Sequence, residues 1–131
     1  MKEIKWNYHS PKFECDTYNL EMMKYSPWSG HRLFAYDYIC SMKPDRIVEL
    51  GSYYGCSAFS FLQALKDNNM QSAFWAVDTW EGDSFTENDY TENIYQAYRE
   101  IQNKCFEKQN AHMLRMTFDE AYEKFEDHTI D

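Results

Sequence analysis

The amino-acid sequence predicts an α/β fold, in which helices cover a parallel β-sheet. Short runs of β-forming residues alternate three times with stretches whose apolar residues recur at helical spacing. Alternation of this kind is typical of βαβ units, which place successive strands parallel to one another in one sheet. A hydrophobic content of 44% in 131 residues supplies enough apolar surface for the core of one globular domain.

The first part of the chain is the least regular. Residues 1–27 are rich in Tyr, Lys and Asn, and we predict an N-terminal arm there with at most a short helix near residues 20–23. After this arm Ser29 can cap a helix, which Pro44 ends. The domain itself is predicted over residues 28–131. Its first helix carries apolar residues at helical spacing: Phe34, Ala35, Tyr38, Ile39 and Met42.

Three runs are predicted as strands. Residues 46–50 are β-forming and are followed by Gly51. Residues 73–77 are almost continuously apolar, as expected of a strand that helices cover on both faces. Residues 112–116 form the third run. Because helices connect these runs, the strands are expected to be parallel.

Helices are predicted between and after the strands, each with one apolar stripe facing the sheet. The inward residues are Ala58, Phe61, Leu62 and Leu65 in the first of them, Ile94, Ala97, Tyr98, Ile101 and Cys105 in the second, and Ala121, Tyr122 and Phe125 in the third. Residues 117–120 form a capping box that opens the third. The acidic loop over residues 78–89 lacks the spacing of a calcium loop, so we predict no metal site.

The charge balance excludes several classes of partner. Thirteen Lys and Arg against 22 Asp and Glu give a net charge of −9, which repels phosphate backbones and anionic membranes. Neither nucleic acid nor a membrane is therefore expected as a partner. The chain has no apolar run near the roughly 20 residues of a membrane span, and no secretory signal. The four cysteines lack the spacing of a zinc site, so we predict reduced thiols in a cytoplasmic protein.

The residues with a chemical role gather where the first strand meets the next helix. Residues 48–57 are Val-Glu-Leu-Gly-Ser-Tyr-Tyr-Gly-Cys-Ser. Gly51 lets the chain turn and leaves room for a ligand on bare backbone, while Gly55 and Ser57 present N–H groups at a helix N-terminus to an anion. The same glycines would also serve a tight strand-to-helix turn that binds nothing.

A second acidic residue supports a cofactor site. Asp78 ends the second predicted strand, where nucleotide-binding α/β domains present a carboxylate to the ribose hydroxyls. A dinucleotide site would need Gly-x-Gly-x-x-Gly, but Ser52 and Tyr53 follow Gly51 and block the close approach of a pyrophosphate. The pattern therefore favours S-adenosylmethionine (SAM) over NAD.

Five segments, in order, also resemble a known family. They are residues 28–32, 34–37, 46–51, 76–83 and 114–121. They resemble successive motifs of class I SAM-dependent methyltransferases, in a bacterial branch often encoded beside, or fused to, glycosyltransferases. The resemblance implies the first three βα units of a Rossmann-like three-layer sandwich, with SAM as cofactor. It also implies methyl transfer to an unidentified acceptor, such as a sugar or another small molecule.

The resemblance further implies which residues line the cofactor site. At the methionine and ribose end these are Glu49, Gly51, Ser52, Gly55, Ser57 and Asp78, and at the adenine they are Thr79, Trp80, Met116 and Thr117. No catalytic residue and no metal ligand is identified.

Residues 129–131 resemble the start of a fourth strand, and the family's remaining strands do not follow in this sequence. We therefore expect weak cofactor binding and little catalysis by this chain alone. In the family's fold the first strand lies mid-sheet, so an open edge on residues 46–50 predicts a homo-oligomer in which a second copy covers it. Two alternatives stay open, a non-catalytic half-domain that acts as a binding or assembly module and a nicotinamide-binding domain.

Overall fold

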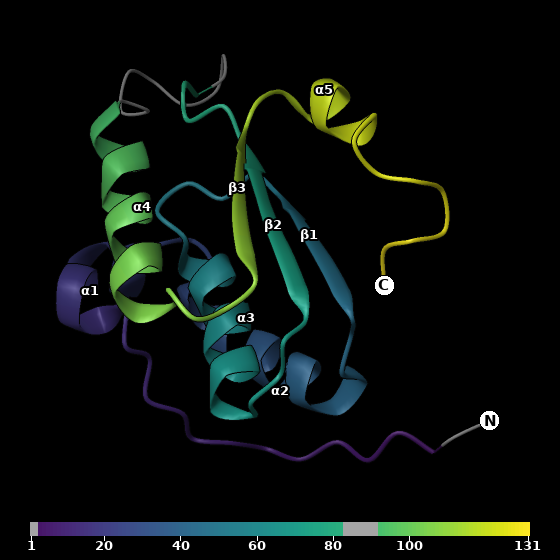
Figure 1. Cartoon of the computed structure of the whole chain (residues 1–131). Helices are drawn as coiled ribbons and strands as arrows, with labels where there is room; N and C mark the ends of the chain where they lie inside the picture. Colours follow the sequence, from purple (N-terminus) through teal and green to yellow (C-terminus); the bar gives the residue numbers. More distant parts are fainter. Residues whose placement is uncertain (1–2, 83–91) are drawn as a thin grey trace.

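The computed structural model describes residues 3–82 and 92–131. Within them the chain forms a three-stranded parallel sheet in the order β1-β2-β3 (Figure 1). The strands are β1 (Arg46–Leu50), β2 (Ala73–Asp78) and β3 (Ala111–Arg115). The predicted bounds of the first strand are confirmed, the second is one residue longer than predicted, and the third begins and ends one residue earlier. The parallel pairing confirms the predicted α/β class.

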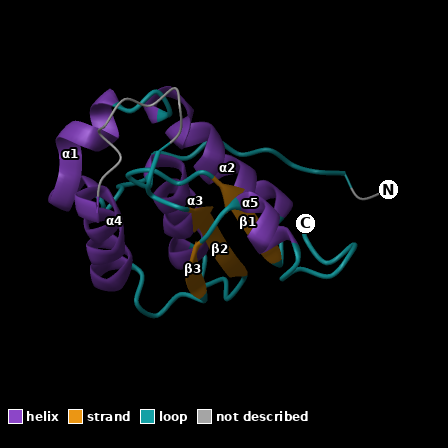
Figure 2. Cartoon of the chain, turned by 90° about the horizontal axis from the view of Figure 1, so that it is seen from above, coloured by secondary structure: helices purple, strands orange, loops and turns teal. Residues whose placement is uncertain are grey.

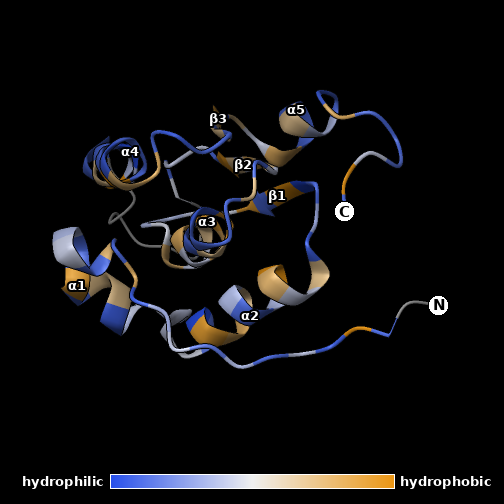
Figure 3. Ribbon diagram, turned by 60° about the horizontal axis from the view of Figure 1, so that its bottom comes forward, coloured by the Kyte–Doolittle hydropathy of each residue, from blue (hydrophilic) through white to orange (hydrophobic). Residues whose placement is uncertain are grey.

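Helices cover both faces of this sheet. One face carries α1 (Asp16–Tyr25), α2 (Arg32–Met42), α3 (Cys56–Asp67) and α4 (Glu92–Cys105), and the other carries α5 (Phe118–Tyr122) with the C-terminal segment (Figure 3). Seen from above, α3 lies between α4 and α2 (Figure 2). None of the helices in the described part of the chain is long and apolar enough to cross a membrane.

Helix α3 is the centre of the core. Phe59 stacks on Tyr98 of α4 and on Phe106, with ring centroids 4.7 Å and 5.7 Å away. Three of its predicted inward residues are completely buried: Ala58, Leu62 and Leu65. The fourth, Phe61, is partly buried and packs against Phe74 of β2. The predicted stripe of α3 is therefore confirmed.

The N-terminal residues are tied to the domain. Helix α1 includes the predicted residues 20–23 but is longer, with a kink at Asn19. The His9 ring lies 2.7 Å from a carboxylate oxygen of Asp37, which is buried in α2. Three N-terminal residues belong to the hydrophobic core: Phe13, Cys15 and Met23. All four cysteines lie within the described residues and are free thiols.

Three predictions about the helices are wrong. Ser29 begins a 3-10 turn (Ser29–His31) and makes no side-chain cap to the helix that follows. In α2 only two of the five residues of the predicted stripe are inward: Ala35 and Ile39 are buried, while Phe34, Tyr38 and Met42 are exposed. In α5 Tyr122 points to solvent. The sheet and α3 cover only part of each apolar stripe.

The free edge of β1 is less open than predicted. The N–H of Asp131 donates to the carbonyl of Arg46 at 3.1 Å. Its carboxylate in turn accepts hydrogen bonds from the N–H groups of Asp45 and Arg46, at 2.8 Å and 2.9 Å. At the other end of the strand, Leu50 is 59% exposed. The start of the edge is therefore paired, and its end remains accessible.

Candidate functional site

The loop between β1 and α3 turns at two glycines. Gly51 has φ +87° and Gly55 has φ +92°, in the left-handed region that L side chains rarely adopt. The Gly51 N–H donates to the carbonyl of Val77 at 2.8 Å, which extends the pairing of β1 with β2. Among the described residues, a Cβ atom at Gly51 would meet only a ring carbon of Phe118, at 3.8 Å. The backbone at Gly51 thus has room for a ligand beside it.

Gly55 serves the packing of α3. A Cβ atom there would lie 2.3 Å from the buried ring of Phe59, so no larger residue fits without movement of the core. The Gly55 N–H donates to the carbonyl of Ser52 at 2.8 Å, so it is already engaged within the turn, and its contact with an anion stays a prediction. Because Gly55 is the N-cap of α3, the N–H groups of residues 56–58 have no partner within the helix. These three groups are the anion donors that the turn offers.

The Asp78 carboxylate holds the glycine turn in place. Its Oδ2 accepts hydrogen bonds from the N–H groups of Ser52 and Tyr53, at 2.9 Å and 3.0 Å. Its Oδ1 accepts from the N–H of Trp80 at 2.8 Å. Asp78 is buried at the end of β2, the strand end where the sequence predicted it, and its carboxylate faces the glycine turn. The carboxylate links the loops that follow β1 and β2.

Trp80 supports the same turn from the core side. Its indole N–H donates to the carbonyl of Tyr53 at 2.9 Å. The ring is 1% exposed and packs edge-on against Tyr95, with centroids 5.2 Å apart. A ring buried in this way does not present a face to a ligand. In this conformation Trp80 shapes the site from behind, and a contact with adenine stays a prediction for its backbone alone.

The remaining predicted residues lie at the same edge of the sheet. Thr79 follows Asp78 and is partly buried. The N–H of Met116 donates to the carbonyl of Asp78 at 3.1 Å, which brings the end of β3 beside the end of β2. Thr117 caps α5, its hydroxyl oxygen accepting from the N–H of Glu120 at 3.2 Å, as the predicted capping box requires. The ten predicted residues therefore share the carboxyl edge of the sheet.

The Glu49 carboxyl has an unusual electrostatic environment at this edge of the sheet. Its Oε2 accepts a hydrogen bond from the Ser57 hydroxyl at 2.6 Å. Its Oε1 and the Ser52 hydroxyl oxygen are buried without a well-formed hydrogen bond to any described residue. Burial raises the pKa of the Glu49 carboxyl to about 7, although the Ser57 and Ser52 hydroxyls lower it; the charge of Asp78 raises it further. The Ser52 hydroxyl thus lies close to the Glu49 carboxyl but makes no well-formed hydrogen bond with its Oε1. Because buried polar atoms normally have a partner, a polar ligand group would complete the hydrogen bonding of both.

Tyr98 contributes a third atom of this kind. Its hydroxyl is buried and has no hydrogen-bond partner in the described part of the chain. Burial, together with the charges of Glu49 and Asp78, raises the pKa of the Tyr98 phenol well above its usual value. The sequence predicted Tyr98 only as a core residue of α4. The sequence signal that could have identified Tyr98 as a site residue is that the hydroxyl of a buried tyrosine needs a polar partner.

Metal binding finds no support in the described residues. They contain no group of three or more His, Cys, Asp or Glu side chains that could hold a metal ion. Three acidic residues of the predicted loop, Asp83, Glu87 and Asp89, lie outside the described residues.

A glycine turn after the first strand, clamped by a carboxylate at the end of the adjacent strand, defines an α/β domain of the nucleotide-cofactor-binding class. A family model described as a methyltransferase domain matches residues 48–131, which include the turn, Asp78 and the segment after β3. The chain belongs to this family of class I SAM-dependent methyltransferases. SAM, the cofactor expected from the sequence, is the methyl donor of such enzymes.

Known proteins similar to the chain include one sequence relative and one solved structure. "Uncharacterized protein y4gI" of Sinorhizobium fredii (strain NBRC 101917 / NGR234) is 36% identical over 107 residues, which are 82% of this chain and 11% of that protein. The crystal structure of the SAH-bound Podospora anserina methyltransferase PaMTH1 has a TM-score of 0.65 at 15% identity, and the match covers 92% of this chain and 48% of that one. This likeness shows the methyltransferase Rossmann-like fold. The chain spans less than half the length of either protein.

Proposed function

We propose that the carboxyl edge of the sheet binds SAM and that the domain serves methyl transfer from SAM to an acceptor. The observation that carries this proposal is a pair of buried polar atoms beside the backbone of Gly51, Glu49 Oε1 and Ser52 Oγ, which lie near each other but form no well-formed hydrogen bond. These atoms belong to the segment that matches a methyltransferase domain. Their chemistry fits the polar methionine part of SAM.

Each part of SAM has a counterpart among these residues. The ammonium group of SAM fits the Glu49 carboxyl. The carboxylate of SAM fits the N–H groups of residues 56–58 at the N-terminus of α3. The family resemblance assigns the ribose to the rim at Asp78 and the adenine to residues 116–117. When bound, SAM supplies a methyl group activated by the sulfonium. The residues of this chain bind and align it, which is the main protein contribution to a direct displacement.

We also propose a small-molecule acceptor, such as a sugar hydroxyl. The support is the resemblance to the branch associated with glycosyltransferases. Radiolabelled SAM incubated with the chain and a panel of sugars tests this, with labelled sugar as the expected product. Label transfer only to protein would contradict it.

Calorimetric titration with SAM, SAH and NAD tests cofactor binding. We expect SAM and SAH to bind weakly, with Kd above about 1 μM, and NAD not to bind. Ser52→Ala should weaken SAM binding about three- to tenfold, since one hydrogen bond is lost. Ser72→Ala, at the opposite end of the sheet, is the matched control and should bind as the unmodified chain does.

Other results of this titration would favour one of the alternatives or contradict the expected weak binding. Binding of NAD but not SAM would favour the nicotinamide-binding alternative. If neither ligand binds, the proposal fails and the half-domain alternative is favoured. Submicromolar SAM binding would contradict the expectation that this chain alone binds weakly.

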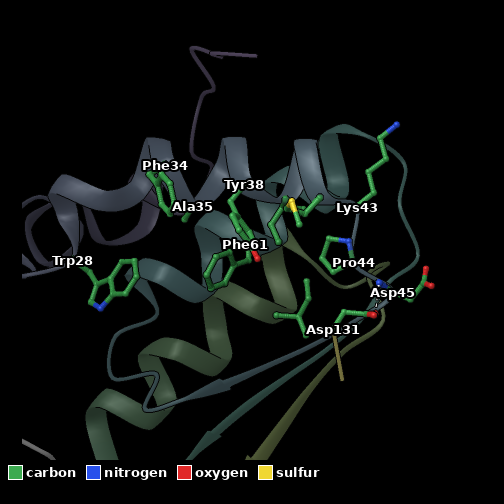
Figure 4. Close-up of a pocket in the computed structure, with 12 residues that line it drawn as sticks. Trp28, Phe34, Ala35, Tyr38, Lys43, Pro44, Asp45, Phe61 and Asp131 are labelled. Atoms are coloured by element: carbon green, nitrogen blue, oxygen red, sulfur yellow. Dashed lines mark hydrogen bonds between the residues drawn. The ribbon is translucent and has the colours of Figure 1, made fainter. Parts of the chain in front are cut away.

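We further propose that a second copy of the chain covers the α2 groove, a hollow of about 510 Å³ between α2, α3 and the start of β1. Figure 4 shows Trp28 at one end of this groove and Asp131 at the other. Phe34, Tyr38 and Met42 of α2 line it and are 59%, 41% and 43% exposed. Exposed apolar side chains gathered along one groove form a surface that two-fold pairing can bury.

Light scattering at micromolar concentration tests this pairing. The unmodified chain should be a dimer and Tyr38→Ser should shift it toward monomer. Tyr25→Ser changes an exposed tyrosine on α1, away from the groove, and should leave the dimer intact. A stable monomer of the unmodified chain would contradict the proposal.

A further inference from the structure

The Glu49 carboxyl lies among groups that do not offset a negative charge. Ser57 of α3 donates one hydrogen bond to it, and Ser52 lies near it in the glycine turn. Asp78, at the end of β2, adds a second carboxyl, and the buried phenol of Tyr98 in α4 is close enough for both carboxyl charges to act on it. Within the described part of the chain, the ion pairs all lie elsewhere, and no cation acts on Glu49.

This setting contrasts with that of Asp78. Three backbone N–H groups donate to the Asp78 carboxylate, whereas Glu49 accepts one well-formed hydrogen bond, from Ser57, and its buried Oε1 has only the nearby Ser52 hydroxyl, with which it forms none. A buried carboxylate without a cation is unfavourable and takes up a proton. Burial accordingly brings the pKa of Glu49 to about 7, within the physiological range.

We infer that Glu49 is a proton-coupled receptor for the positive charge of SAM: it carries a proton in the free chain and releases that proton when the ligand's ammonium binds at the glycine turn. The inference rests on the proposed function and adds its pH dependence. The O–H bond of the carboxyl breaks, the proton passes to solvent buffer, and the carboxylate pairs with the ligand's cation. No other bond changes. The buried site then holds one negative and one positive charge in place of a neutral acid.

The pKa of Glu49 in the free and the bound chain sets the size of the pH effect. An opposite charge within a few Å restores the ionised form of a buried acid. If binding returns the pKa of Glu49 from about 7 to the usual 4.5, SAM binding releases about 0.9 proton at about pH 6. SAM affinity should then be about eightfold weaker at about pH 6 than at about pH 7.5.

Calorimetry in buffers of different ionisation enthalpy measures the released proton directly. The unmodified chain should release it at the lower pH and bind SAM more weakly there. Glu49→Gln keeps an acceptor for Ser57 but cannot ionise, so proton release should vanish and SAM affinity should vary less than about twofold over the same range. Glu120→Gln, an exposed glutamate in α5, is the matched control and should behave as the unmodified chain.

A second measurement does not depend on ligand binding or on the folding of a variant. Carbon NMR of the carboxyl groups in the free, unmodified chain should show one glutamate that titrates near neutral pH. If all glutamates titrate near their usual pKa, the inference is overturned. SAM binding without proton release or pH dependence overturns it as well, while the proposed function stands. If SAM does not bind at either pH, the proposed function fails, and the inference with it.

Discussion

The glycine turn and the α2 groove are hollows of opposite character. The turn is fixed by hydrogen bonds between its backbone and one buried carboxylate, that of Asp78. The groove is lined mainly by aromatic and aliphatic side chains, four of which are exposed, with polar groups near Asp131. Preorganised polar groups recognise a small charged ligand, whereas an apolar groove is suited to a larger surface whose burial is its main driving force. The glycine turn is therefore suited to a small charged ligand, and the α2 groove to a larger apolar surface.

Gly55→Ala should be the most damaging change at the turn. The added Cβ would clash with Phe59 and force a left-handed backbone on alanine, which should lower the free energy of unfolding by about 2–5 kcal/mol. Gly51→Ala suffers the backbone strain alone, so about 1–2 kcal/mol is expected. Gly30→Ala, with open space around it, is the control. Equal losses at Gly51 and Gly55 in urea unfolding would show that packing of Phe59 is not the reason.

Asp78→Asn should loosen the turn next. The amide keeps the size of the side chain but turns a donor toward backbone N–H groups that need an acceptor, which should cost about 2–4 kcal/mol of unfolding free energy. Hydrogen exchange at Ser52 and Tyr53 should rise in the same variant. Asp127→Asn, on the exposed C-terminal segment, should change neither. Unchanged exchange in Asp78→Asn would contradict the role of this carboxylate as a clamp.

Glu49 should make stability depend on pH. Its folded pKa of about 7 lies above the usual 4.5, so between these values the folded chain keeps a proton that the unfolded chain has lost. Stability is therefore highest below this window and falls as pH rises through it. Relative to Glu49→Gln, the unmodified chain should lose about 2–3 kcal/mol from about pH 5 to about pH 8. A constant difference across this range would contradict the raised pKa.

Trp80→Phe and Trp28→Phe compare the two regions directly, with the smallest effects. Trp80 is 1% exposed and its indole N–H is bonded to Tyr53, so its replacement should cost about 1–2 kcal/mol. Trp28 lines the groove and is 45% exposed, so its replacement should change stability by less than about 0.5 kcal/mol. Thermal or urea unfolding measures both. A larger loss at Trp28 would show that the groove is as tightly fixed as the turn.

Local patterns predicted much of the fold. The bounds of β1 follow from a β-forming run that a glycine ends, and the cap at Thr117 follows from its distance to Glu120. The position of Asp78 at a strand end was predictable because it directly follows an apolar β-forming run. The stripe of α2 was harder, since periodicity places apolar residues on one side of a helix but does not show how much of that side a neighbour covers. Ala35 is covered and Phe34 is not.

The sequence by itself determined the order of strands and helices, the place of the glycine turn and the two acidic residues beside it. These depend on residues close together in the chain. Only the tertiary structure decided that Trp80 is buried, that Phe59 leaves no room at Gly55, and that the pKa of Glu49 is raised. Burial and electrostatics depend on groups brought together from distant positions, as when Asp78 binds the N–H of Ser52 across 26 positions of sequence.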